Sequence, residues 1–329
     1  MRDGKEVVLH IYEPLPSSNT THTSNPELRP CVINFHGGGF TIGSGTDDSR
    51  WAHWVTRTST SEVGATNETT TSAPSTMTRD KELVLGGIFI SVEYRLAPEY
   101  PFPIPVNDCI DATKYILAHT EEFGIDRGKV FLSGFSAGGS LAVTTALALS
   151  SSSSSTTTST TMSTTSTTPA QDLTNDTQTN PIAGVIAFYP VLDFSTPRSI
   201  KLANSNPQGG VVKPLPGWMT RMFDTSYLPP SPSIDRLDPM ISPGLIDEKK
   251  LREFPNCHLV LCGADVLAAE GRDFGRKLER ARESKGTREV VVRTVVGARH
   301  GWDKPPLPLQ ASVGVEYNAA VASMRRWCL

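Results

Sequence analysis

Clusters of basic residues are missing from this 329-residue sequence. It contains 31 Lys and Arg against 34 Asp and Glu, which gives a formal net charge of -3 at pH 7. Without a broad basic surface, a protein cannot neutralise the phosphates of a nucleic acid. We therefore expect no nucleic-acid partner.

Long apolar runs and paired cysteines are also missing. No uninterrupted apolar stretch could span a bilayer, and residues 2–6 are mostly charged where a signal peptide would have its apolar segment. The five cysteines are odd in number and lack the spacing of metal ligands, so we expect reduced thiols. These features predict a soluble, cytoplasmic protein without a membrane span.

Three segments are poor in apolar residues and rich in Ser, Thr and Asn: 17–25, 56–80 and 150–180. Such a composition cannot bury enough apolar surface to offset the entropy lost when the chain is ordered. We predict disordered loops between structured elements. The alternative is a tether that carries sugar or phosphate groups.

The remaining sequence alternates short apolar runs with helical patterns, which is typical of a mostly parallel sheet covered by helices. We predict a single α/β domain, 1–329, with a Pro-rich and aromatic cap insertion at 195–245. Helices are expected from Ala137 to Leu149 and from Ala268 to Ala281. The predicted strands are 6–12, 31–35, 87–93, 129–133, 181–189, 258–262 and 289–296.

A Gly-x-Ser-x-Gly pattern, residues 134–138, lies between a predicted strand and a predicted helix. This is the setting of a nucleophile elbow, a turn so tight that its flanking residues must be glycine while the serine hydroxyl is exposed. The alternative is a Gly-rich connection with an idle serine. We interpret Ser136 as a nucleophile.

Three successive glycines, 37–39, follow the predicted strand 31–35. Glycines leave backbone N–H groups free to face a cavity, where they can stabilise the oxyanion of a tetrahedral intermediate. We interpret the preceding His36 as a structural residue that braces this loop.

A serine nucleophile needs a histidine base, and the histidine needs a carboxylate that fixes its tautomer. His300 follows the last predicted strand, and Asp265 follows the strand 258–262, so both fit the order Ser, Asp, His. The competing carboxylates are better explained as helix-face, cap or loop charges; they are Asp193, Asp247, Glu270 and Asp303.

Several separated motifs together resemble the hormone-sensitive-lipase-like esterases, also called the α/β-hydrolase fold-3 group. They are His36 to Phe40 (HGGGF), Tyr94 to Glu99 (YRLAPE), Gly134 to Gly139 (G-x-S-A-G-G), Asp238-Pro239 with Ser242-Pro243 (DP-x-x-SP), and Asp265 to Glu270 (D-x-L-x-x-E). The resemblance implies an α/β-hydrolase fold and no metal or organic cofactor. It also implies that the backbone amides of Gly38, Gly39 and Ala137 form the oxyanion hole.

Two features depart from this family. Its members usually begin with extra N-terminal helices that form part of a lid, whereas this sequence starts almost at its first predicted strand, so we expect a reduced cap. Gly-Phe commonly follows the family's histidine, and here Gly301-Trp302 follows it, which keeps an aromatic wall and narrows the pocket.

We therefore expect a serine hydrolase that cleaves small carboxylic esters of short to medium acyl chains. One alternative is an amidase, deacetylase or lactonase with the same triad. The other is an inactive ligand-binding paralogue, comparable to the gibberellin receptors of plants. Family members often pair, so a homodimer is possible. Our candidates for the acyl pocket are Phe40, Phe194, Trp218, Met219 and Phe223.

Overall fold

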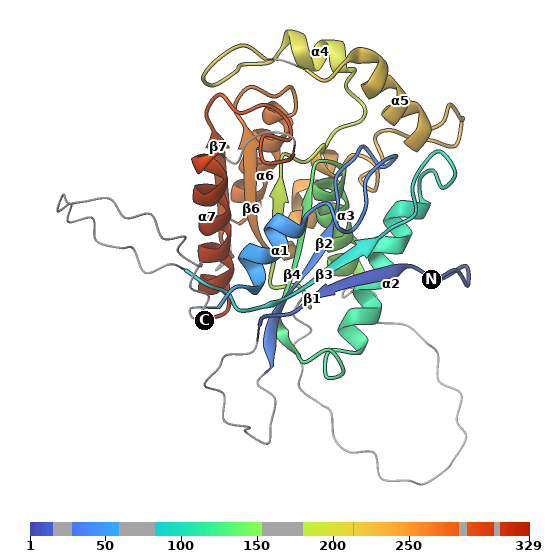
Figure 1. Cartoon of the computed structure of the whole chain (residues 1–329). Coiled ribbons are helices and arrows are strands. Elements are labelled where there is room, and N and C mark those ends of the chain that lie inside the picture. Colours follow the sequence, from blue (N-terminus) through green and yellow to red (C-terminus); the bar gives the residue numbers. More distant parts are fainter. Residues whose placement is uncertain (16–27, 59–82, 153–179, 213, 283–287, 306–309) are drawn as a thin grey trace, which may run out of the picture.

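A seven-stranded sheet forms the centre of the protein (Figure 1). The computed structural model describes residues 1–15, 28–58, 83–152, 180–212, 214–282, 288–305 and 310–329. The predicted loop 17–25 and most of the loops 56–80 and 150–180 lie outside the described residues. Residues 150–152 were predicted to be loop but continue a helix, in which the Ser150 hydroxyl donates to the Ala146 carbonyl at 2.8 Å.

The sheet has the order β1-β3-β2-β4-β5-β6-β7 and is parallel except for β1, which pairs antiparallel with β3. Each predicted strand corresponds to one of these strands, with ends that differ by a few residues. The strands are β1 (Val8–Tyr12), β2 (Arg29–Phe35), β3 (Ile88–Glu93), β4 (Ile125–Phe135), β5 (Gly184–Phe188), β6 (Asn256–Cys262) and β7 (Val290–Val295).

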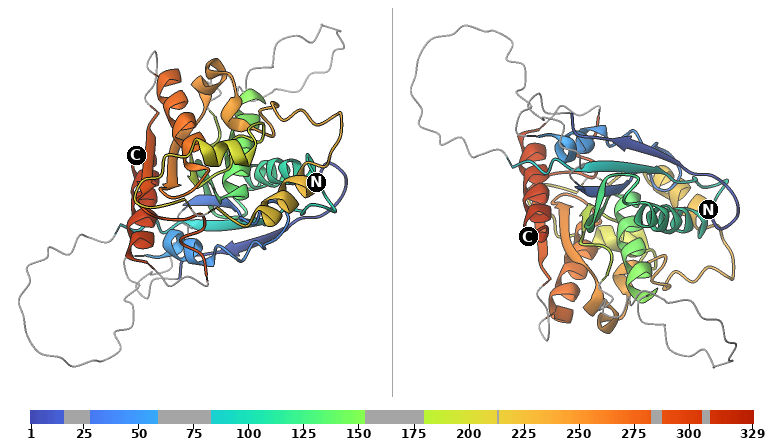
Figure 2. Two further views of the ribbon diagram at one scale, coloured as in Figure 1. Left: turned by 90° about the horizontal axis from the view of Figure 1, so that it is seen from above. Right: turned by 90° about the horizontal axis from the view of Figure 1, so that it is seen from below.

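Helices cover both faces of the sheet (Figure 2). One apolar core joins the sheet to α2 (Ile104–Ala118), α3 (Ala137–Ser152) and α6 (Ala268–Arg282), and the other joins it to α1 (Ser49–Thr56) and α7 (Ala311–Trp327). Successive side chains of a strand point to opposite faces, so Ile33 and Phe35 lie in the first core and Val32 in the second. Burial on both faces explains why the inner strands β2 to β6 are largely apolar.

The stretch between β5 and β6 contains α4 (Arg198–Ala203), α5 (Gly217–Tyr227) and the short 3₁₀ helices η1 (Pro243–Leu245) and η2 (Glu248–Glu253). In Figure 1, α4 and α5 lie above the carboxyl ends of the parallel strands. The division of the chain into one domain with a cap insertion stays a prediction. Within the described residues, no helix is long and apolar enough to cross a bilayer.

Candidate active site

Ser136 lies in the turn that joins β4 to α3, and its backbone has a φ of 53°. A non-glycine residue in this region is strained and is retained only where the surroundings fix it. The Ser136 amide donates to the Phe188 carbonyl at 2.9 Å. A Cβ on Gly138 would lie 1.9 Å from the Phe35 carbonyl oxygen, so only glycine lets the helix pack this closely on β2.

The structure brings Ser136, His300 and Asp265 together from the carboxyl ends of β4, β7 and β6. The Ser136 Oγ lies 2.8 Å from His300 Nε2, and His300 Nδ1 lies 2.6 Å from Asp265 Oδ2. An ionised carboxylate only accepts hydrogen bonds, so Nδ1 carries the proton and Nε2 is the acceptor that faces the serine. Asp265 is 7% exposed, and its other oxygen accepts from the Leu267 amide at 3.2 Å.

The competing carboxylates have other partners. Asp193 accepts from the amide and hydroxyl of Ser195, and Asp247 caps η2. Glu270 accepts from the Leu192 amide and pairs with Lys201. Asp303 accepts from two tyrosines described below. Among the described residues, Asp265 is the carboxylate that contacts His300.

The resemblance to the esterase family implies three oxyanion donors, the backbone amides of Gly38, Gly39 and Ala137. Gly38 and Gly39 have φ values of 115° and 62°, and a Cβ on Gly39 would lie 2.4 Å from the Phe223 ring. Within the described part of the chain, the amides of Gly38, Gly39 and Ala137 donate to no protein acceptor. They are therefore available to a developing negative charge.

The loop that carries these glycines is held by the Tyr94 to Glu99 segment. The Tyr94 hydroxyl donates to the His36 carbonyl at 2.8 Å, and the two rings stack at 4.3 Å. The Ala97 amide donates to the Phe40 carbonyl at 2.8 Å. His36 Nδ1 lies 2.7 Å from the Gly37 carbonyl, and burial lowers the pKa of His36, so a neutral ring braces the loop.

Sequence reasoning missed a buried polar network behind His300. The Tyr189 ring packs edge-on against the His300 ring at 4.9 Å. Its hydroxyl donates to Asp303 at 2.5 Å, and the Tyr317 hydroxyl of α7 donates to the same carboxylate at 2.6 Å. Lys304 joins Asp303 to Asp48 near the glycine loop. The motifs gave no signal for this network, because its members meet only in the folded chain.

Two cavities adjoin Ser136. The first has a volume of about 250 Å³ and lies under α4 and α5, and the second, of about 740 Å³, lies beside the glycine loop. Ser136, Phe223 and His300 line both.

The predicted pocket residues divide between these cavities, with one exception. Phe40 and Phe194 line the first cavity, and Met219 lines the second. Trp218 was predicted to line the pocket, but it is 68% exposed and lines neither cavity. The inner face of α5 is formed by Thr220, Phe223 and Tyr227, and the helical period places Trp218 away from it.

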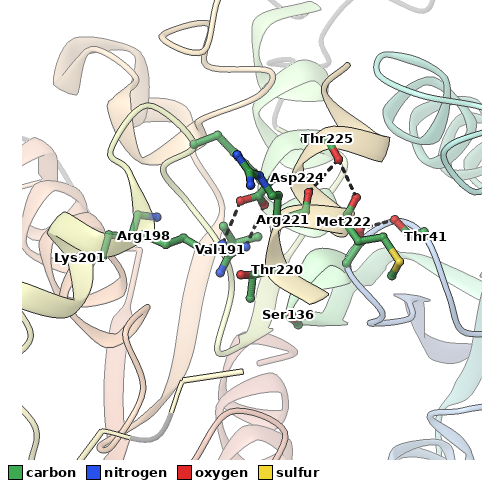
Figure 3. A network of polar contacts seen from close by, with 12 residues as sticks. Thr41, Ser136, Val191, Arg198, Lys201, Thr220, Arg221, Met222, Asp224 and Thr225 are labelled. Carbon is green, nitrogen blue, oxygen red and sulfur yellow. Dashed lines mark hydrogen bonds and ion pairs between the residues drawn. The ribbon is translucent and has the colours of Figure 1, made fainter. Parts of the chain in front are cut away.

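An ion pair in the first cavity was also missed (Figure 3). Arg198 Nε and Nη2 donate to the two carboxylate oxygens of Asp224, each at 3.0 Å. Burial is the largest single effect and lowers the pKa of Arg198. The hydrogen bonds to Asp224 and the negative charges of Asp224, Glu270 and Asp265 together outweigh it and raise the pKa, so the guanidinium stays charged. The pocket residues predicted in this stretch were Trp218, Met219 and Phe223, none of which is charged.

The described residues contain no group of three or more His, Cys, Asp or Glu that could hold a metal ion.

Comparisons with known proteins match this chain to α/β hydrolases in sequence and in structure. The model of the α/β hydrolase fold family matches residues 71–303. Lipase 2 of Moraxella sp. (strain TA144) is 26% identical over 91% of this chain, and arylacetamide deacetylase of Bos taurus is 29% identical over 66% of it; each match spans 60% of the relative's own length. The crystal structure of the carboxylesterase EstE1, cloned from a metagenomic library, has a TM-score of 0.69 at 22% identity, covering 99% of this chain and 86% of that chain.

The sheet order, the elbow at Ser136 and the family match define an α/β hydrolase. Within that fold, the chain belongs to the hormone-sensitive-lipase-like esterase family, as its sequence motifs predict.

Proposed function

We propose that this protein is a serine hydrolase that cleaves carboxylic esters of short to medium acyl chains. The observation that carries the proposal is the chain of hydrogen bonds from Ser136 through His300 to Asp265, with Ser136 opening onto two cavities. The names of the relatives, which include a lipase and a deacetylase that acts on arylacetamides, support acyl transfer.

The reaction proceeds in two steps. Ser136 Oγ attacks the ester carbonyl while His300 Nε2 takes its proton, and Asp265 stabilises the resulting imidazolium. The amides of Gly38, Gly39 and Ala137 stabilise the oxyanion, each by about 3 kcal/mol. His300 then protonates the leaving alcohol, and water hydrolyses the acyl-enzyme by the same route in reverse.

The first cavity suits the acyl group. Its walls are largely apolar, and its volume of about 250 Å³ lies below the usual range for drug-sized ligands. The second cavity, of about 740 Å³, then remains for the alcohol part of the ester. The expected homodimer and cytoplasmic location stay predictions.

Steady-state hydrolysis of p-nitrophenyl butyrate tests this proposal. We expect Ser136→Ala to lower kcat by about 10⁴-fold or more, because the nucleophile is removed. The exposed Ser233→Ala serves as the matched control and keeps wild-type activity. Turnover by a folded Ser136→Ala variant near the wild-type rate would refute the assignment.

Amide hydrolysis is the second candidate, and the similarity to arylacetamide deacetylase favours testing it. The same triad attacks any activated acyl group, and the pocket distinguishes the leaving groups. We expect a higher kcat/KM for p-nitrophenyl butyrate than for the anilide of the same acyl group. The reverse preference would identify an amidase.

A further inference from the structure

The first cavity next to Ser136 adjoins another cavity, also of about 250 Å³, that does not reach the serine. Four residues line both of these spaces and therefore form the partition between them: Val191, Phe194, Arg198 and Asp224. Val191 and Phe194 are 5% and 8% exposed and belong to the apolar core of the sheet. The rest of the partition is the ion pair.

This ion pair connects two helices of the stretch above the sheet (Figure 3). Arg198 is the first residue of α4, and Asp224 lies on α5, so their side chains meet across the space between the helices. Both hydrogen bonds measure 3.0 Å, and the two side chains are 30% and 25% exposed. A planar two-bond contact of this kind holds both side chains in one orientation.

The two sides of the partition differ in chemistry. On the Ser136 side, the cavity is lined by apolar side chains such as Leu202, Leu215 and Leu267. On the far side, Asp193, Lys201 and Arg236 contribute charged groups. An alkyl chain gains free energy from apolar walls but gains little from charged ones. Displacing one partner of this partly buried ion pair would leave the other without its counter-charge.

We propose that the Arg198–Asp224 ion pair closes the far end of the acyl cavity and sets the longest acyl chain that the site accepts. This inference rests on the proposed esterase function. Chains that end before the ion pair bind in the apolar part of the cavity. Longer chains must push against Arg198 and Asp224 or bend back toward solvent.

The test is the dependence of kcat/KM on acyl length, measured with p-nitrophenyl esters from acetate to laurate. For the wild-type protein, we expect a rise of about fourfold per methylene until the chain meets the ion pair, and then a fall. The double variant Arg198→Ala/Asp224→Ala joins the two cavities and leaves no lone charge. We expect its ratio of decanoate to butyrate activity to be about tenfold or more above that of the wild type.

Two further variants distinguish the loss of a cavity wall from a general loosening of the contact between α4 and α5. Arg198→Met/Asp224→Leu removes the charges but keeps the volume, so we expect the wild-type length limit. Asp273→Ala/Arg276→Ala removes an exposed ion pair on α6 and is the matched control. If the alanine pair does not fold, as judged by circular dichroism, Arg198→Ser/Asp224→Ser opens the same space and retains hydrogen-bonding groups.

The outcomes distinguish this inference from the proposed function. An unchanged length limit in a folded, butyrate-active opening variant would overturn the inference and leave the esterase intact. A limit extended equally by the volume-conserving pair would also overturn it. Absence of turnover of every ester by the wild-type protein would overturn the proposed function, and the inference with it.

Discussion

At the scale of single residues, the site depends on three side chains that come from three different strand ends. Ser136 has a left-handed backbone that costs about 1–3 kcal/mol and is held by tight packing of the adjacent glycines. His300 lies between this serine and a mostly buried carboxylate. Asp265 and Asp303 both lie near His300, but only Asp265 bonds to its ring, so the two carboxylates have separable roles.

Replacing these two aspartates by asparagine should separate orientation of the histidine from support of its loop. We expect Asp265→Asn to lower kcat by about 10⁴-fold without loss of the fold, because an amide favours the wrong tautomer of His300. The Asp303 carboxylate accepts hydrogen bonds from the hydroxyls of Tyr189 and Tyr317. Asp303→Asn removes its charge and should lower the free energy of unfolding by about 3 kcal/mol. Its effect on kcat should be much smaller.

Urea unfolding and hydrolysis of p-nitrophenyl butyrate measure the two effects. A folded Asp303→Asn variant with a loss of kcat as large as that of Asp265→Asn would contradict the division of roles.

The sequence was sufficient to predict which residues meet at the site but not what surrounds them. Ser136, Asp265 and His300 each follow an apolar run, and parallel strands bring their carboxyl ends to one edge. Arg198 and Asp224 lie 26 residues apart on two different helices of a Pro-rich stretch, so nothing in the sequence indicates that they pair. Trp218 shows the same limit, because an aromatic residue on a short helix can face either the core or solvent.

At the scale of elements, the connection of β4 to α3 determines where the nucleophile lies. The inner strands β2 to β6 were predictable because burial on both faces makes them largely apolar. Helices α1 and α7 were not predicted, although α7 supplies Tyr317 to the polar network behind His300. The amphipathic pattern of α7 is weak because many of its residues are small, whereas α1 has a clear amphipathic pattern but spans only eight residues.

Substitution of Gly138 tests the close packing of this connection. A methyl group there would overlap the Phe35 carbonyl at 1.9 Å, and a backbone atom cannot move away without disturbing β2. We expect Gly138→Ala to lower the free energy of unfolding by about 3 kcal/mol and to reduce activity. Gly128→Ala, at an exposed position where the nearest atom lies 3.4 Å away, is the control for urea unfolding. Equal stability of the two variants would contradict the packing argument.

At the scale of the whole molecule, the doubly covered sheet buries a titratable side chain in its interior. His258 of β6 is fully buried, and its Nδ1 lies 2.8 Å from the Ser323 hydroxyl of α7. Burial, together with Arg293 and Arg326, lowers the pKa of His258 from 6.5 to about 3, against a smaller opposing effect of Glu289. The folded protein therefore keeps this ring neutral while the unfolded chain takes up a proton.

This difference makes stability depend on pH. The contribution of His258 is full above about pH 6.5 and is lost as the pH falls toward 3, because only the unfolded state binds the proton there. Between pH 7 and pH 5, we expect a loss of about 2 kcal/mol from this residue. Burial also lowers the pKa of His36, so His258 accounts for only part of the pH dependence of stability.

Urea unfolding at pH 7 and pH 5 measures this dependence. We expect His258→Gln to flatten it, whereas His53→Gln, at an exposed position, should leave it as in the wild type. An equal pH dependence in the wild type and in His258→Gln would show that His258 titrates normally in the folded protein.

The central claim is that Ser136 is the nucleophile, and covalent labelling tests it most directly. The protein is treated with a serine-directed alkyl phosphonate, and the adduct is located by intact mass and peptide mapping. The account predicts one adduct per chain, on Ser136, which forms as ester turnover is lost and fails to form in His300→Ala. Absence of labelling in the folded wild-type protein, or an inactivating adduct on another residue, would contradict it.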